Sequence, residues 1–376
     1  SCWPAPPAPW PAEALSRLWP TGRPRPLGPD AASLLLARAL GLPYRGRADG
    51  LMNELQPRET VISLQQLRRV FKSRKSTVEA VAGIDLEVYA GEIFGFLGPN
   101  GAGKTTTLRM LATLLPPTSG EAKVAGKDLR RQPGEVRRLI GYVGQSGGVD
   151  PEVIGRTELT FQGRLYGISA AEAGRRAQEL IDTLELQVCA DRKVSTYSGG
   201  QRRRLDIGVG LVHRPRLLFL DEPTTGLDPQ SRARMWDEVR NLRKRGTTVF
   251  LTTHYLEEAD VLCDRLAIID RGRIVAEGTP AELKREVAGD LITVEVTGDA
   301  DAALRLLQSR AFVREASVDG SSLRLYVDHG ERATPDILRL LDGAGLGLTT
   351  IALSRPSLDD VFLRQTGRSL RESESA

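Results

Sequence analysis

The stretch "GPNGAGKTT", residues 98–106, constrains the fold more than any other part of this sequence. It follows the apolar run "EIFGFLG" (92–98), which is typical of a buried strand. It precedes the helix-like "KTTTLRMLATLL" (104–115), which we expect Pro116 and Pro117 to end. Glycines let the backbone curl so that successive N–H groups point at a bound anion, and the positive end of the following helix adds to this. The order strand, loop, helix predicts a P-loop, a phosphate site in an α/β domain.

The side chains of this loop match the P-loop pattern of two glycines, a lysine and a threonine. We expect the Lys104 ammonium to reach the β- and γ-phosphates of ATP and the Thr105 hydroxyl to ligate Mg²⁺. A glycine turn that merely precedes a helix is the alternative, and the required order of strand, loop and helix argues against it. The other loop residues expected to contact the nucleotide are Gly98, Asn100, Gly101, Gly103 and Thr106.

An acidic pair ends another apolar run, "LLFLDE" (217–222). A strand that ends in Asp221 would place a carboxylate beside the P-loop, where it can hold Mg²⁺ through water. Glu222 would then orient and polarise the attacking water as a general base. A strand ending in "DE" usually means only a solvated strand end, so the prediction depends on the pairing with the P-loop.

The stretch "YSGGQRRRLDIGVGL" (197–211) indicates a second Gly-rich turn at a helix start, with Ser198 as the cap. It lies just upstream of "LDEPTTGLD" (220–228). With its motifs in this order, the chain resembles the nucleotide-binding subunit of ATP-binding cassette (ABC) transporters over roughly residues 60–285. The resemblance implies ATP hydrolysis by a head-to-tail dimer of two chains. The P-loop of one chain and the signature loop (197–201) of the other would clasp the same ATP.

The resemblance also assigns roles to single residues near the dimer interface. Ser198 and Gly200 would contact the γ-phosphate of ATP held by the partner chain, in a loop that also contains Gly199 and Gln201. Asp228, in "GLD", matches the loop that crosses the interface. By itself Asp228 would be a plain turn residue.

Three further positions match nucleotide contacts of the family. Gln145, at the end of "IGYVGQ", matches the glutamine that meets Mg²⁺ and the attacking water and relays the nucleotide state to the membrane partner. His254 matches the switch histidine that contacts the γ-phosphate. Phe71, in "RRVFKS", matches the aromatic residue that stacks on adenine. Taken singly, these would be a strand-end glutamine, a structural histidine and a core residue.

Two positions depart from the family pattern. Tyr197 stands where the family most often has leucine, which is a tolerated variant. Ile154 stands where related chains often have threonine, in a region that should face the membrane partner. This departure therefore bears on the coupling of the ATPase to that partner rather than on ATP chemistry. We expect the arginine run 202–204 to be a solvated helix face.

Short apolar runs alternate with helical patterns along the main body, which predicts an α/β P-loop NTPase core. We expect strands at 216–221 and 247–254 and a β-hairpin at 265–278. Stronger helix patterns between about 150 and 200 predict a helical subdomain inserted into this core. We assign residues 52–287 to the ATP-binding domain.

The pattern changes after about residue 288, where the predicted elements follow the order βαββαβ. This order predicts a small ferredoxin-like α+β domain at 288–368, followed by a polar tail at 369–376. The stretch "SLDDVFLRQTGRSL" (357–370) and the signature stretch resemble the ATPases of daunorubicin-resistance-type drug exporters. In that family the ATPase serves a separate multi-span permease that expels hydrophobic compounds.

Residues 1–51 contain ten of the 22 prolines and three of the four tryptophans, which predicts a disordered extension. We expect Met52 to be the natural start, and a regulatory or targeting extension is the alternative. This segment has six arginines and three acidic residues, a net charge of +3. The rest of the chain therefore carries only about +1 of the total of +4. We therefore expect no nucleic-acid partner.

The location of the protein is predicted from its cysteines and its hydropathy. Cys2, Cys189 and Cys263 lie far apart and form no metal-type or disulfide spacing, as is typical of a reducing, cytosolic setting. No window approaches the roughly 20 apolar residues of a membrane span. We expect the chain at the cytoplasmic face of the cell membrane, held there by the permease.

The motifs favour a transporter subunit that binds and hydrolyses ATP to power export of a drug-like or other hydrophobic compound. A soluble ABC ATPase acting on DNA or ribosomes is the alternative. Only 94 positions separate Lys104 from Ser198, too few for the long coiled coil of the DNA-acting members, and ribosome-acting members usually hold two cassettes. A catalytically dead regulator is less favoured, because Lys104, Asp221, Glu222 and His254 are all present.

Overall fold

The computed structural model describes most of the chain, and every structural statement below concerns that part. The described residues are 59–73, 76–287, 289–320, 322–354 and 357–366. The predicted N-terminal extension (1–51) and polar tail (369–376) lie outside them.

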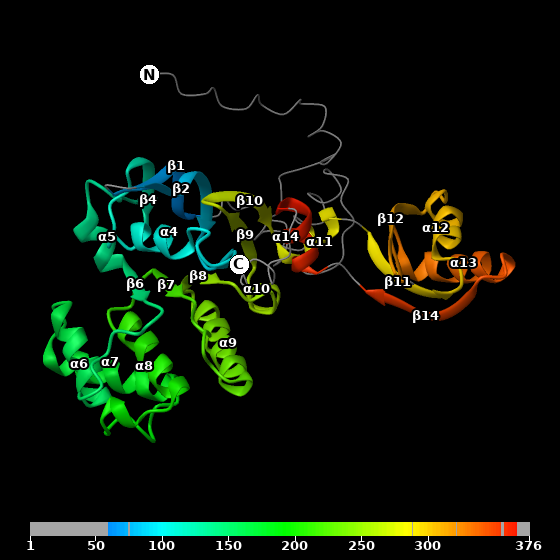
Figure 1. The fold of residues 1–376 in the computed structure, drawn as a ribbon. Helices are drawn as coiled ribbons and strands as arrows, with labels where there is room; N and C mark the ends of the chain where they lie inside the picture. The colour runs from blue at the N-terminus through cyan, green and yellow to red at the C-terminus, as the bar shows by residue number, and fades with distance from the viewer. Residues whose placement is uncertain (1–58, 74–75, 288, 321, 355–356, 367–376) are drawn as a thin grey trace, which may run out of the picture. The chain divides into compact units, whose positions relative to one another are not determined.

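A six-stranded sheet forms the centre of the nucleotide-binding part, with the strand that precedes the P-loop in its interior (Figure 1). In sheet order the strands are β10 (Arg273–Gly278), β9 (Arg265–Asp270), β3 (Ile93–Leu97), β8 (Thr248–Thr253), β7 (Leu217–Asp221) and β6 (Ile140–Val143). The β9–β10 pair is antiparallel, as the predicted hairpin requires, and the other pairs are parallel. Every residue of β3, β7 and β8 is buried, as is typical of parallel strands covered on both faces.

A second, antiparallel sheet contributes to the same hydrophobic interior. Its order is β2 (Thr77–Tyr89), β1 (Thr60–Lys72), β4 (Ser119–Val124) and β5 (Lys127–Asp128). Ile62 of β1 and Val88 of β2 belong to one buried cluster with Phe94 of β3 and Phe250 of β8. This shared cluster packs the antiparallel sheet against the P-loop strand and its neighbour β8.

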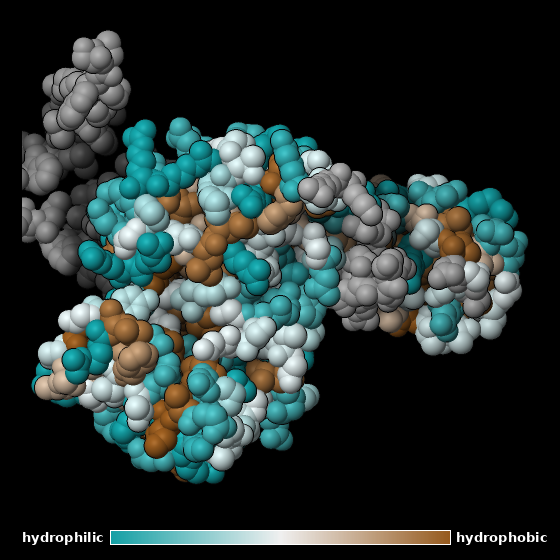
Figure 2. Space-filling model, turned by 60° about the vertical axis from the view of Figure 1, so that its left-hand side comes forward, coloured by the Kyte–Doolittle hydropathy of each residue, from teal (hydrophilic) through white to brown (hydrophobic). Residues whose placement is uncertain are grey.

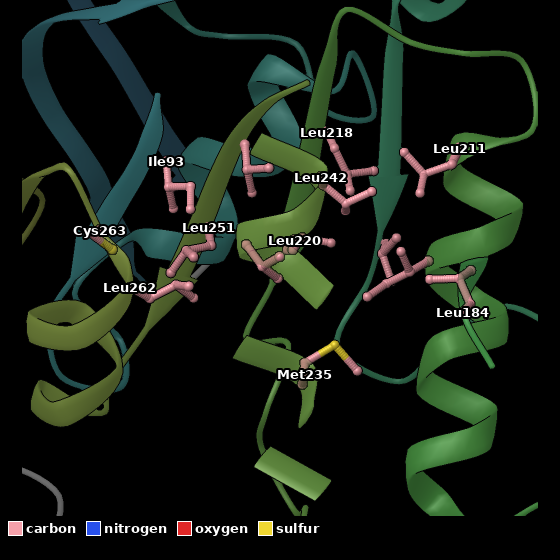
Figure 3. Packing of buried hydrophobic residues seen from close by; sticks show 14 of the residues in the cluster. Ile93, Leu184, Leu211, Leu218, Leu220, Met235, Leu242, Leu251, Leu262 and Cys263 are labelled. Carbon is pink, nitrogen blue, oxygen red and sulfur yellow. The ribbon is translucent and has the colours of Figure 1, made fainter. Parts of the chain in front are cut away.

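The predicted helical subdomain lies between β6 and β7, as one group of green helices in Figure 1. It comprises α6 (Gly155–Leu165), α7 (Ala170–Thr183), the short 3₁₀ helix η1 (Val194–Thr196) and α8 (Gly199–Leu211). A large apolar cluster joins it to the sheet and to α9 (Pro229–Lys244) and α10 (Leu256–Leu262). Figure 3 shows Leu218 and Leu220 of β7 close to Leu251 of β8 and to Met235 and Leu242 of α9.

The helix after the P-loop ends earlier than the sequence predicts. Helix α4 covers Lys104–Leu111, whereas we expected it to continue to residue 115, before the two prolines. The backbone of Thr113 has a φ of 61°, which is left-handed and cannot continue a helix. The amide groups of Leu114 and Leu115 both donate to the carbonyl of Arg109 as the chain turns.

The C-terminal part has the predicted order of elements. Strands β12, β13, β11 and β14 form one antiparallel sheet in that order, packed with α12 and α13 around a separate apolar cluster (Figure 1). The bounds are β11 (Asp290–Thr297), α12 (Ala300–Gln308), β12 (Val313–Asp319), β13 (Ser322–Val327), α13 (Gly330–Gly343) and β14 (Gly347–Ser354). This is the βαββαβ arrangement.

Three helices complete the described fold: α5 (Pro133–Leu139), α11 (Pro280–Val287) and α14 (Leu358–Thr366). The buried Val361 and Phe362 of α14 belong to the same cluster as Leu262 of α10 and Leu283 of α11. The last helix therefore packs on the nucleotide-binding part rather than on the sheet before it. In the described part of the chain, no helix combines the length and the apolar character needed to cross a membrane.

Candidate functional site

The P-loop connects β3 to α4 and forms one wall of a cavity of about 180 Å³. Its backbone can take this path only with glycine at particular positions. Gly103 has a φ of 108°, and a Cβ there would overlap the Ala80 carbonyl oxygen. The cavity is lined by Ala80, Pro99, Asn100, Gly101, Gly103, Lys104, Thr105, Thr106, Gln145 and Glu222. The structure thus brings the P-loop residues together with Gln145 and Glu222. Gly98 is not among the lining residues.

Lys104 begins α4 and is buried in this cavity, with 4% of its surface exposed. Its Nζ donates to the carbonyl oxygens of Gly98, at 2.7 Å, and Pro99, at 3.1 Å. The same Nζ lies 3.3 Å from Glu222 Oε1. The ammonium is therefore held at the loop by oxygen acceptors, where phosphate oxygens could take their place.

Asp221 ends β7 and lies beside the start of α4, fully buried. Its Oδ1 accepts hydrogen bonds from Thr105 Oγ1, at 3.0 Å, and from Thr252 Oγ1, at 2.7 Å. Its Oδ2 is buried without a hydrogen-bond partner among the described residues. A carboxylate oxygen and a threonine hydroxyl are ligands that Mg²⁺ prefers, and the unpaired Oδ2 leaves an acceptor for an ion or its water. These two residues therefore fit a magnesium ion.

Glu222 is the centre of the polar contacts in the cavity. Its Oε2 accepts from Gln145 Nε2 at 3.0 Å and from Thr225 Oγ1 at 3.2 Å, and lies 3.3 Å from His254 Nδ1. Its backbone has a φ of 46°, a strained conformation for a residue with a Cβ. The Glu222 amide donates to Thr252 Oγ1 at 3.0 Å, which helps to hold this conformation.

The charge state of Glu222 follows from its surroundings. Burial acts to raise the pKa of its carboxyl, but contacts with His254 and Lys104 outweigh burial and lower that pKa to about 2. Glu222 is therefore a carboxylate at neutral pH, able to accept a proton only after its contacts change. The structure thus brings His254, expected to contact the γ-phosphate, beside Glu222.

The signature loop lies away from the cavity of its own chain. Ser198 Oγ accepts from the amide of Gln201 at 3.3 Å, and Gln201 Oε1 accepts from the amide of Ser198 at 3.0 Å, so the two form a capping box at the start of α8. Ser198 and Gly199 are exposed, and Gly200 is partly exposed. These residues are not brought to the P-loop of the same chain.

Asp228 and Phe71 also lie outside the lining of the cavity. Asp228 caps α9, where its carboxylate accepts from the amide of Ser231 at 2.9 Å and from its hydroxyl at 2.6 Å. Phe71, in β1, is 40% exposed, and the guanidinium carbon of Arg69 lies 4.6 Å from the centre of its ring. Phe71 is thus a surface residue, available to stack on a planar group.

The expectation of a solvated arginine face at 202–204 is wrong. Arg203 is 7% exposed, and its guanidinium donates to three main-chain carbonyls at the ends of β6 and β7. The neighbouring Arg204 donates to the Leu184 carbonyl at 3.0 Å. Helical spacing does not single out Arg203, because buried residues lie on several faces of α8.

Thr252 is a site residue that the sequence did not indicate. Its hydroxyl contacts both members of the acidic pair, donating to Asp221 Oδ1 and accepting from the Glu222 amide. The pairing of β7 with β8 places Thr252 opposite Asp221. Nothing in the run "TTVFLTTH" distinguishes this threonine from its neighbours, so only the sheet register shows its role.

Comparison with known proteins agrees with this geometry. The family model for ABC transporters matches residues 81–225, and that for the C-terminal domain of ATP-binding proteins like DrrA1-3 matches residues 278–366. Daunorubicin resistance ATP-binding protein DrrA3 of Streptomyces coeruleorubidus is 44% identical over 85% of this chain and 99% of its own length. Daunorubicin/doxorubicin resistance ATP-binding protein DrrA of Streptomyces peucetius is 48% identical over 77% of this chain and 88% of its own length.

Solved structures show the same fold for the nucleotide-binding part. A dimeric ATP-binding cassette in a post-hydrolysis state, bound to ADP and Pi, has a TM-score of 0.54 and 25% identity, covering 58% of this chain and 98% of its own. The family, fold and activity predicted from the sequence are confirmed, and a DNA- or ribosome-acting ATPase is not favoured. The chain belongs to the ATP-binding proteins of ABC transporters, and is an ATP-binding and ATP-hydrolysing transporter subunit.

Proposed function

We propose that this subunit powers the export of a drug-like or other hydrophobic compound through a separate membrane permease. The observation that supports this most is the cluster of Lys104, Gln145 and His254 around the Glu222 carboxylate. The names of its relatives supply the substrate class, since they include resistance proteins for daunorubicin, doxorubicin and linearmycin and a Nod factor export protein.

In this proposal Lys104, Glu222 and His254 are the catalytic residues. Lys104 leaves Glu222 and binds the β- and γ-phosphates of ATP when the nucleotide enters the cavity. Glu222 then orients the attacking water and accepts its proton, and His254 contacts the γ-phosphate. The loop residues Gly98, Asn100, Gly101, Gly103 and Thr106 surround the phosphates with backbone N–H groups and polar side chains.

Magnesium is part of the same proposal. Thr105 and Asp221 would hold the ion, with Gln145 placed to reach both the ion and the attacking water. Bound Mg²⁺ neutralises charge on the phosphate oxygens. The unpaired Asp221 Oδ2 supports this assignment, because a buried carboxylate oxygen without a donor is costly.

We propose that two copies of the chain act as a homodimer. The exposed loop of Ser198, Gly199 and Gly200, followed by Gln201, would close on ATP held by the partner's P-loop, with Asp228 at the interface. Their placement outside their own cavity supports a role across a dimer. Phe71 would stack on the adenine, as an exposed ring at the surface of β1 can.

We also propose a domain division in which residues 52–287 bind ATP and residues 288–368 form an accessory domain. The separate apolar cluster of the C-terminal sheet supports this division. No nucleic-acid partner is proposed.

The permease is proposed to dock on the helical subdomain, at the cytoplasmic face of the membrane. Phe161 and Leu165 of α6 and Tyr166, which follows it, are 52%, 64% and 43% exposed. Ile154, just before α6, is 40% exposed, and hydrophobic colour gathers over the lower left of Figure 2. Exposed apolar side chains grouped in this way are typical of protein contacts. These residues lie on the segment that follows Gln145. A movement of the docked permease could therefore be passed along this segment to the nucleotide site.

Recovery of a partner from membranes tests this function. Tagged Glu222→Gln protein with ATP should recover a multi-span membrane protein in equal amount from detergent-solubilised host membranes. The same Glu222→Gln protein with Phe161→Ser and Leu165→Ser added has an identical nucleotide site. It should lose that partner while still binding ATP. Recovery of ribosomes or DNA with no membrane protein would contradict the proposal.

A further inference from the structure

Arg203 lies near the start of α8, and each of its three nitrogens donates a hydrogen bond to a main-chain carbonyl. The distances are 2.6 Å from Nη1 to Gly144 O, 2.9 Å from Nη2 to Asp221 O and 3.0 Å from Nε to Pro223 O. Two of these carbonyls belong to the residues on either side of Glu222. The guanidinium therefore holds the backbone around the proposed general base.

The third carbonyl ties the same guanidinium to Gln145, because Gly144 directly precedes it in the chain. The side chain of Gln145 in turn donates from Nε2 to Glu222 Oε2 at 3.0 Å. A guanidinium is planar and presents its donors in a rigid fork, unlike the single flexible ammonium of lysine. Arg203 can therefore fix the spacing of the two segments that bear Gln145 and Glu222.

The environment of Arg203 makes these hydrogen bonds costly to lose. Burial lowers the pKa of its guanidinium, and the carboxylates of Asp206, Asp221 and Glu258 act in the opposite direction. Since arginine stays protonated in proteins, this buried cation depends on the carbonyl oxygens for its hydrogen bonds. Removing it would take one donor away from each of the three carbonyl oxygens.

We propose that Arg203 is a positioning residue for ATP hydrolysis, which sets Gln145 and Glu222 in the geometry that the attacking water requires. This inference rests on the proposed role of Glu222. It adds a link within one chain between the signature loop and the P-loop site. Helix α8 begins at the signature loop and includes Arg203 within its first turns. A shift of the signature loop would therefore move Arg203 and, through its hydrogen bonds, Gln145 and Glu222.

Arg204 provides a matched control on the same helix. Its side chain is 11% exposed, and it donates to the Leu184 carbonyl in the helical subdomain, at 3.0 Å, away from the nucleotide cavity. A lysine at either position keeps the positive charge and most of the volume. The two lysine substitutions therefore differ chiefly in where hydrogen bonds are lost: beside Gln145 and Glu222 for Arg203, and in the helical subdomain for Arg204.

The test compares Arg203→Lys with Arg204→Lys in full-length protein, measuring kcat, KM, nucleotide affinity and thermal unfolding. For Arg203→Lys we expect kcat to fall at least about tenfold with nucleotide affinity within about threefold, because misplaced groups cost rate rather than ground-state binding. Arg204→Lys should change neither by more than about threefold. If Arg203→Lys does not fold, Arg203→Gln must show the same fall. An unchanged kcat, or an equal loss in Arg204→Lys, would overturn the inference.

A double-mutant cycle with Gln145→Ala checks that Arg203 acts through its neighbours. The loss of kcat in the double variant should be smaller than the product of the two single losses, and an additive result would overturn the inference.

Failure of the proposed function would give a different result from failure of this inference. If Glu222→Gln hydrolyses ATP at the wild-type rate, the role of Glu222 fails. If it is inactive while Arg203→Lys is fully active, only the role of Arg203 fails.

Discussion

Lys104 Nζ lies 3.3 Å from Glu222 Oε1, so the P-loop cation and the proposed general base are in direct contact. In this arrangement His254 and Lys104 together lower the pKa of Glu222, which makes the carboxylate a poor proton acceptor. ATP would draw Lys104 toward its phosphates, and Glu222 would regain basicity at the moment when a base is needed. The Lys104–Glu222 ion pair would thus be one link between nucleotide binding and activation of the base.

Replacing Lys104 should weaken nucleotide binding. We expect Lys104→Ala to weaken ATP affinity by roughly tenfold or more, because charge-assisted hydrogen bonds contribute about 1.5–3 kcal/mol each. Equilibrium binding of a fluorescent ATP analogue measures this. Lys127→Ala is the control, since Lys127 pairs with Glu135 and is not among the cavity residues. Affinity equal to wild type in Lys104→Ala would contradict the assignment of the P-loop.

The lowered pKa of Glu222 predicts a pH dependence of stability. The pKa is about 2 in the folded protein against an ordinary value of 4.5. A depressed carboxyl stabilises the fold above its unfolded pKa, and this contribution is lost as pH falls toward the folded value. The free energy of unfolding should therefore fall more steeply below pH 4.5 in wild type than in Glu222→Gln.

Chemical denaturation at several pH values measures this difference. The extra slope should also shrink in Lys104→Ala, because Lys104 is one cause of the lowered pKa. Parallel curves for wild type and Glu222→Gln would show that Glu222 is not held as a carboxylate by its neighbours.

A side chain at Gly103 should disrupt the phosphate loop. Its φ is 108° and a Cβ would overlap the Ala80 carbonyl, so Gly103→Ala should destabilise the protein by about 1–3 kcal/mol and remove ATP binding. Gly134→Ala is the matched control, because a Cβ in that helix would meet nothing within 4 Å. Denaturant unfolding and nucleotide binding of both variants decide the point. Normal ATP binding by Gly103→Ala would mean that the loop takes another path.

The signature loop should act between chains. In the Glu222→Gln background, Ser198→Ala should bind ATP normally but fail to form the ATP-dependent dimer, as light scattering can show. Loss of the helix cap alone costs about 1 kcal/mol. Ser169→Ala removes an equivalent cap, in which Ser169 Oγ accepts from the Glu172 amide at 3.3 Å, and should leave the dimer intact. Equal behaviour of the two variants would remove Ser198 from the interface.

Local motifs predicted the parts of the site that are local in the chain. The P-loop, the acidic pair and the capped signature helix each occupy one short stretch, and their backbone conformation follows from glycines, caps and apolar runs. Roles for Gln145 and His254 could be proposed because each matches a motif position of the family that the chain resembles.

Arg203 and Thr252 could not be placed in the same way. The acceptors of Arg203 come from the ends of two strands that are distant from it in sequence, at Gly144, Asp221 and Pro223. No local pattern shows that three carbonyl oxygens will converge on one arginine. A run of three arginines resembles a solvated face until the sheet is assembled beside it.

Glu222 is proposed to be the general base for ATP hydrolysis at this P-loop, and the steady-state ATPase rate of Glu222→Gln, measured beside its ATP affinity, tests this role. The substitution keeps the size and hydrogen-bonding oxygen of the side chain but removes the base. We predict wild-type affinity with a kcat lower by about a hundredfold or more, as loss of a general base entails. Undiminished hydrolysis by Glu222→Gln would show that Glu222 is not the base.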